Sequence, residues 1–154
     1  MNQKIKIIVA FSVGILFLLL VGLFSFKNMS EYKDSSKWVT HTQVVISEAE
    51  QVLSYCQDIE TANRGFAITG KEDYLIPFNN ALSNLPKTMD SLESMTRKNP
   101  GQQKLILKLE AEVMHKVSFG MKVNDTCRRK GIAAAQKLIV QDTGRIIMDK
   151  IRSQ

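Results

Sequence analysis

Arg64 is the residue of this sequence whose chemistry best suits recognition of a ligand. Its planar guanidinium group fits a carboxylate, so it could bind an anionic ligand. Glu60 lies four residues before it, which is the favourable order for an ion pair within one helix. We therefore expect Arg64 to pair with Glu60 and to hold the end of the helix near Tyr74. Binding of an anion is the alternative.

The two histidines, His41 and His115, are the candidates for a metal site or a pH sensor. Neither has a His or Cys three or four residues away, so the spacing of a metal site is missing. We expect both to be packing or surface residues. His41 would sense pH only if a partner favoured one of its protonation states. No nucleophile elbow, phosphate-binding glycine loop or dinucleotide fingerprint occurs, so we expect neither enzymatic activity nor a cofactor.

The charge of the chain is a weak argument for binding nucleic acid. The formal net charge is +6, but Lys4, Lys6 and Lys27 flank one apolar stretch. The other residues carry 18 basic and 15 acidic side chains, a surplus of only three. The basic run Arg128-Arg129-Lys130 has no aromatic residues interleaved with it, which favours a solvated helix face over a phosphate site. We expect no nucleic-acid partner.

Cys56 and Cys127 lie on different predicted helices, at positions typical of a core. Oxidising conditions outside the cell membrane would permit a disulfide bond. We favour two buried thiols, because free cysteine is a common core residue. The spacing supports no zinc or redox site.

The stretch from Glu60 to Gly70 ends a long predicted helix. Its apolar residues recur every seven positions and predict a buried seam, formed by Trp38, Val45, Val52, Ile59 and Phe66. Gly65 removes a side chain where another backbone could come close. Thr69-Gly70 stops the helix, since glycine readily takes the left-handed conformation of a last turn.

Residues Ile7 to Phe26 carry no charge and predict a membrane span in contact with lipid. Twenty residues at about 1.5 Å each cover a hydrocarbon core of about 30 Å. A cleaved signal peptide is the alternative, but the stretch is long and offers no small-x-small cleavage site. The positive-inside rule places the N-terminal amine, Lys4 and Lys6 in the cytoplasm and the residues after Lys27 outside.

Further helices follow the first, separated by short turns. The second is expected to open at Lys71 to Asp73 and to contain Pro86. Asn99-Pro100-Gly101 predicts the next turn, and a third helix follows. Its predicted inward residues are Ile106, Leu109, Val113, Val117 and Val123, and those expected mostly outward are Lys104, Lys108, Glu110, Glu112 and Lys116. Gly131 and Asp142-Thr143-Gly144 predict two later breaks. The fold class is all-α, an N-terminal transmembrane helix continuing into an antiparallel four-helix bundle.

The ordered motifs of this chain resemble the CHASE3 family of bacterial extracytoplasmic sensor domains, over roughly Ser35 to Arg152. The residues that match the motifs, and that could serve structure or signalling, are Trp38, His41, Thr42, Glu60, Thr61, Arg64, Gly65, Phe66, Thr69, Gly70, Tyr74, Met148, Asp149 and Arg152. Where the family often has Gly-Gln before the Arg-Gly pair, this chain has Ala62-Asn63.

The resemblance implies the sensory domain of a receptor whose output is a histidine kinase, a cyclic-nucleotide enzyme or a chemotaxis-type transducer, usually as a homodimer. We expect residues 1–27 to be the cytoplasmic N-terminus and span, 28–36 a helical linker, and 37–152 the sensor domain. The span would lie in the bacterial inner membrane, with the sensor domain periplasmic or extracellular. A second span and an output module are typical of the family, and we recognise neither within these 154 residues. The alternative is a ligand-free structural dimerisation or assembly module anchored by one span.

Overall fold

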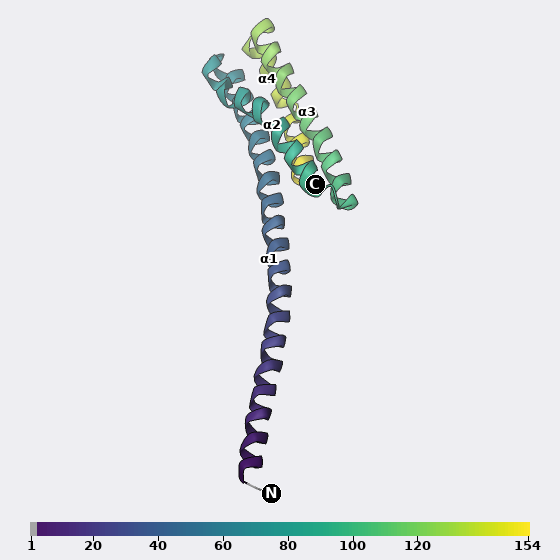
Figure 1. The fold of residues 1–154 in the computed structure, drawn as a ribbon. Coiled ribbons are helices and arrows are strands. Elements are labelled where there is room, and N and C mark those ends of the chain that lie inside the picture. The colour runs from purple at the N-terminus through teal and green to yellow at the C-terminus, as the bar shows by residue number, and fades with distance from the viewer. Residues whose placement is uncertain (1–2) are drawn as a thin grey trace. The chain divides into compact units, whose positions relative to one another are not determined.

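The computed structural model describes the backbone of residues 3–154, and the side chains of that range except those of residues 10 and 27–35. Throughout this part of the chain the regular structure is helical, which confirms the all-α prediction (Figure 1). The elements are α1 (Gln3–Thr69), the short 3-10 helix η1 (Glu72–Leu75), α2 (Ile76–Thr96), α3 (Pro100–Lys130), α4 (Ile132–Val140) and α5 (Thr143–Arg152). The chain forms two compact units, residues 1–43 and 44–154.

The first unit contains part of α1 only. Gln3–Phe26 is the one helical stretch among the described residues that is long and apolar enough to cross a membrane, and none of it is buried. Its isoleucine, leucine and phenylalanine side chains face outward, an arrangement that a bilayer stabilises and water does not. The N-terminal amine of Met1 and the side chains of residues 27–35, which entered the prediction of orientation, lie outside the described residues.

The predicted seam is buried only in the second unit. Val52 and Ile59 are fully buried and Phe66 is 2 % exposed, whereas Val45 is half-buried. Trp38 is 70 % exposed, so its predicted burial in the seam is wrong for a single chain. Trp38 belongs to the first unit, which holds no second helix to cover it.

The end of α1 has the predicted conformation. Gly70 adopts a φ of 68°, and its N–H donates to the Phe66 carbonyl oxygen at 2.8 Å, which closes the last turn. The Thr69 hydroxyl donates to the Gly65 carbonyl at 2.7 Å and accepts from the Lys71 N–H at 3.2 Å. A Cβ atom on Gly65 would overlap the ring of Tyr74 in η1. The close approach at Gly65 is therefore made by a side chain, where the sequence suggested a backbone.

The turn between α2 and α3 is capped by side chains. Asn99 accepts from the Gln102 N–H at 3.2 Å and caps α3, whose first residue is Pro100. The Gln103 amide donates to the Glu93 carbonyl at 2.8 Å and to the Thr96 hydroxyl at 2.7 Å, which ties α3 to the end of α2. Pro86 lies inside α2, as expected.

The fourth helix of the bundle is broken into α4 and α5. Gly131, with a φ of 83°, separates α3 from α4, and Asp142, with a φ of 58°, separates α4 from α5. Both α4 and α5 pack against α3 (Figure 1). Both breaks were predicted. The second break matters for the site described below, because α5 begins there and Gly144 lies in its first turn.

Side chains from every helix of the second unit form one core. Its buried residues are Val52, Cys56, Ile59, Ala62, Phe66, Ala67, Leu75, Phe78, Ala81, Leu85, Met89, Leu92, Ile106, Val113, Val123, Cys127, Ala135, Met148 and Ile151. Cys56 and Cys127 are free thiols, which confirms the favoured prediction. The Cys127 thiol donates to the Phe66 carbonyl oxygen at 3.8 Å.

The burial of Cys56 predicts a loss of stability at alkaline pH. Burial raises the pKa of this thiol from 9.0 to about 11, opposed in part by the nearby Lys116 cation. The unfolded chain therefore releases the proton first, so the contribution of Cys56 to stability is complete below about pH 9 and is lost as the pH rises towards 11. Two pKa units correspond to roughly 2 to 3 kcal/mol.

The free energy of unfolding of the wild type and of Cys56→Ala, measured in urea across this pH range, tests the assignment. We expect the advantage of the wild type to shrink by about 2 to 3 kcal/mol from below pH 9 to pH 11. Two parallel curves would contradict it. The comparison cancels the titration of lysines and tyrosines, which both proteins share.

Candidate functional site

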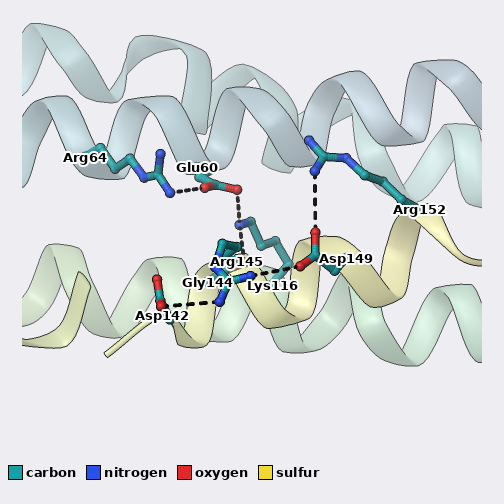
Figure 2. Close-up of polar contacts among 8 residues, drawn as sticks. All are labelled: Glu60, Arg64, Lys116, Asp142, Gly144, Arg145, Asp149 and Arg152. Carbon is teal, nitrogen blue, oxygen red and sulfur yellow. Dashed lines mark hydrogen bonds and ion pairs between the residues drawn. The ribbon is translucent and has the colours of Figure 1, made fainter. Parts of the chain in front are cut away.

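Glu60 lies at the centre of a charged cluster inside the bundle (Figure 2). One carboxylate oxygen contacts Nη2 of Arg64 at 2.5 Å, and the other accepts from Nζ of Lys116 at 2.9 Å. The predicted Glu60–Arg64 pair is confirmed. Glu60 is 19 % exposed and Arg64 is half-exposed, so the network runs from the surface of α1 into the core.

Lys116 joins three helices. Its side chain comes from α3 and is only 1 % exposed. Besides the bond to Glu60 on α1, Nζ donates to the Gly144 carbonyl oxygen at 3.1 Å, in the first turn of α5 (Figure 2). A buried ammonium group without partners would cost several kcal/mol, so these two acceptors permit its burial. The prediction that Lys116 points outward is wrong.

The spacing of the residues on α3 places Lys116 on the buried face of the helix, although the charge of a lysine favours the surface. Buried and half-buried positions on α3 alternate in steps of three and four, through Ile106, Leu109, Val113, Lys116, Gly120, Val123 and Cys127. Lys116 fits this series, and the exposed Lys104 and Lys108 do not. A lysine at a seam position requires a buried carboxylate opposite it, and only the folded bundle identifies Glu60 as that carboxylate.

The α5 side of the cluster carries further ion pairs. Arg145 lies 3.3 Å from Asp142 and 3.4 Å from Asp149, and Arg152 lies 3.6 Å from Asp149 (Figure 2). The motif residues Asp149 and Arg152 thus pair with each other on the surface. The neighbouring motif residue, Met148, is buried in the core.

A small pocket adjoins this cluster. The residues that line it are Glu60, Asn63, Arg64, Lys116, Phe119, Val123, Ile139, Asp142, Gly144 and Arg145. Its interior measures about 20 Å³, room for about one water molecule, and its volume including the open mouth is about 350 Å³. Asn63 is 5 % exposed, and its Oδ1 atom has no hydrogen-bond partner among the described residues.

Asn63 is held in place by α3. A Cβ atom on Gly120 would lie only 2.5 Å from the Asn63 amide nitrogen, so the glycine makes room for this amide. In the sequence, Asn63 is distinguished only by its departure from the family pattern. Its position between the buried Ala62 and the exposed Arg64 gave no reason to expect a lone acceptor beside a pocket.

The other predicted residues do not line the pocket. Trp38, His41 and Thr42 belong to the first unit, where the Thr42 hydroxyl donates to the Trp38 carbonyl at 3.0 Å. Thr61 is exposed on α1, while Gly65, Thr69, Gly70 and Tyr74 shape its end. The Nδ1 atom of His115 lies 3.5 Å from a Glu112 carboxylate oxygen.

The basic run at the end of α3 is paired with carboxylates. Arg128 donates to both oxygens of Glu72, at 2.9 and 2.6 Å, which lowers the pKa of that carboxyl group. The same guanidinium lies 5.6 Å from the centre of the Phe66 ring. Arg129 pairs with Asp125 at 2.6 Å. Both arginines of the basic run are therefore paired with carboxylates.

Comparison with known proteins identifies one family. The CHASE3 domain family matches residues 35–154. No curated protein and no solved structure shows significant similarity to this chain.

The buried pair predicts unequal effects of its two partners on stability. Glu60→Gln leaves Lys116 buried without a counter-charge, and we expect it to lower the free energy of unfolding by about 3 to 5 kcal/mol. Lys116→Met removes the buried charge and leaves Glu60 paired with Arg64, so we expect a loss of less than about 1.5 kcal/mol.

The double variant Glu60→Gln/Lys116→Met completes a thermodynamic cycle, measured by urea unfolding of the full chain in detergent. We expect it to be more stable than Glu60→Gln alone, because no unpaired ammonium remains. The contrary result is that the two single changes lower the free energy of unfolding equally, with the loss in the double variant equal to their sum. That result would show that the pair does not act as a unit.

Proposed function

This chain belongs to the CHASE3 family, and we propose that it is the sensory part of a membrane-bound bacterial signalling receptor. CHASE3 domains are extracytoplasmic sensor domains of such receptors. The observation that carries the proposal is the family match over residues 35–154, preceded by a helical stretch, Gln3–Phe26, suited to crossing a membrane. The output would be a histidine kinase, a cyclic-nucleotide enzyme or a chemotaxis-type transducer.

The proposed orientation puts the N-terminus in the cytoplasm and the bundle outside it. Lys4 and Lys6 precede the apolar stretch, and basic residues that flank a span favour the cytoplasmic side. An extracytoplasmic bundle is also the arrangement that the family has in its receptors.

The proposed mechanism is a displacement of α1 that follows a change in the charged cluster. The helix α1 supplies both the apolar stretch and Glu60. Through Lys116, Glu60 is connected to the first turn of α5. A stimulus that favours one arrangement of these ion pairs over another would favour one packing of α1 against α5, and the helix would carry the shift towards the membrane.

A hybrid receptor tests the sensory function. The chain replaces the CHASE3 input region of a histidine kinase of the same family, and kinase output is read from a reporter gene. We expect Lys116→Met to change basal output about fivefold or more, a coupling typical of allosteric proteins. Lys122→Met is the matched control, because it makes the same change at an exposed position of α3.

The two hybrids must be expressed at equal levels and form equal amounts of dimer. Under those conditions, unchanged output from Lys116→Met would contradict relay through the cluster. It would favour a ligand-free structural dimerisation module.

We also propose that the protein is a homodimer joined in part through α3. An exposed stripe on this helix has apolar residues seven positions apart, Leu107, Met114 and Met121, with the small residues Ala111 and Ser118 between them. This alternation in steps of four and three is the pattern of a coiled-coil seam. A two-fold axis parallel to α3 would place the two copies of this helix side by side and in the same direction, so that each Met114 faces its equivalent.

Cross-linking in intact cells tests both the dimer and the proposed orientation. We expect Met114→Cys to form dimers with a membrane-impermeant bifunctional maleimide, while Val140→Cys, at an exposed site on α4, gives none. The native thiols Cys56 and Cys127 are buried and serve as an internal control.

A membrane-impermeant monofunctional maleimide separates the two claims. Labelling of Met114→Cys without cross-linking would contradict the α3 interface. An absence of labelling until the cells are opened would contradict the extracytoplasmic location.

A further inference from the structure

The pocket beside Lys116 has the charge of an anion site. Three of its lining side chains are cationic, those of Arg64, Lys116 and Arg145. Two are anionic, those of Glu60 and Asp142, which leaves one positive charge in surplus. Binding of a group with a single negative charge would neutralise this surplus.

The cations of the pocket keep hydrogen-bond donors for a ligand. Lys116 uses two of its three ammonium hydrogens, on Glu60 and on Gly144. Arg64 contacts Glu60 through Nη2, one of its three guanidinium nitrogens. Arg64 and Arg145 are both about half-exposed, so their guanidinium groups reach the open mouth, where a carboxylate from solvent can approach them.

One residue of the pocket lining, Asn63, carries an unpaired hydrogen-bond acceptor. The Oδ1 atom of Asn63 is buried and has no partner in the described part of the chain. A buried carbonyl oxygen left unpaired costs free energy, so an occupant that donates a hydrogen bond is favoured there. This acceptor is a second observation, independent of the charges, that indicates a bound group.

The size of the pocket determines which part of a ligand lies in its interior and which part lies at its mouth. The interior of about 20 Å³ admits one group the size of water, such as a hydroxyl group. A carboxylate is too large for that space and must lie at the mouth. The donor and the carboxylate must therefore be joined by a short carbon skeleton.

We propose that this pocket binds a small carboxylate that carries a hydroxyl group on the adjacent carbon, a 2-hydroxy acid. The donor group lies against Asn63 and the carboxylate lies between Arg64 and Arg145. The ligand contacts both α1 and the start of α5, the two helices that Lys116 connects. Its role as the stimulus rests on the proposed sensory function, whereas its binding does not.

Binding is tested on the full chain in detergent micelles, at neutral pH and constant ionic strength. The probe is sodium glycolate, with acetate as the carboxylate without a donor and ethylene glycol as the donor without a carboxylate. Thermal unfolding and equilibrium dialysis of labelled probe measure affinity and stoichiometry. We expect glycolate to bind at one site per chain, at least about tenfold more tightly than acetate, and ethylene glycol not to bind.

Two variants locate the site, each with a matched control. Asn63→Ala should abolish the preference over acetate, whereas Asn124→Ala should retain it, because Asn124 is also buried with an unpaired Oδ1 but does not line the pocket. Arg145→Gln should weaken binding of every carboxylate by about tenfold or more. Arg129→Gln, at an exposed arginine outside the pocket, should not.

Several results would overturn the proposal. One is no saturable binding of glycolate to the wild type, in which case the pocket holds water only. Another is binding of acetate to the wild type as tightly as glycolate, because the donor on the adjacent carbon would then contribute nothing. Retention of the preference in a folded Asn63→Ala, or of full affinity in Arg145→Gln, is a third. Binding without any change of output in the hybrid receptor would leave the site intact and contradict only its role as the stimulus.

Discussion

The buried ion pair between Glu60 and Lys116 is the interaction on which the arrangement of this bundle depends. An ammonium group that is 1 % exposed is stable only where acceptors are fixed around it. Here one acceptor comes from α1 and the other from the backbone of α5, so the lysine of α3 determines which surfaces of three helices face one another. Apolar packing alone is less selective, because a seam of valines and isoleucines tolerates sliding and rotation.

The break between α4 and α5 is part of the same constraint. Gly144 lies in the first turn of α5, and its carbonyl oxygen has two lone pairs, so it can accept from Lys116 as well as within the helix. Asp142, with a φ of 58°, turns the chain so that α5 starts anew beside Lys116. Gly144 also allows close packing, since a Cβ atom there would lie 3.2 Å from the Phe119 ring. The small residues and the charged residues of this layer thus depend on one another.

A charged layer in an otherwise apolar bundle suits a protein that must respond to its surroundings. Ion pairs with a half-exposed member, such as Arg64 or Arg145, can exchange partners at less cost than a packed core can rearrange. The same layer borders the pocket with the unpaired Asn63 oxygen. A bound group would therefore act on the residues that connect α1 to α5, which is where a small change of contacts would alter the packing of two helices.

The sequence alone determined the local features, because they depend on residues close together in the chain. The apolar stretch Ile7 to Phe26, the all-helical class, the end of α1 at Thr69-Gly70, the breaks at Gly131 and at Asp142 to Gly144, and the Glu60–Arg64 pair all follow from spacing, glycine and charge. Tertiary structure decided the rest. Lys116 was assigned to the surface because its charge outweighs its seam position until a carboxylate 56 residues away is placed opposite it. Trp38 was assigned to the core because a heptad shows which residues share a face, but not where the covering helices end. The unpaired oxygen of Asn63 exists only because Gly120, on another helix, admits its amide, and no pattern within α1 contains that information.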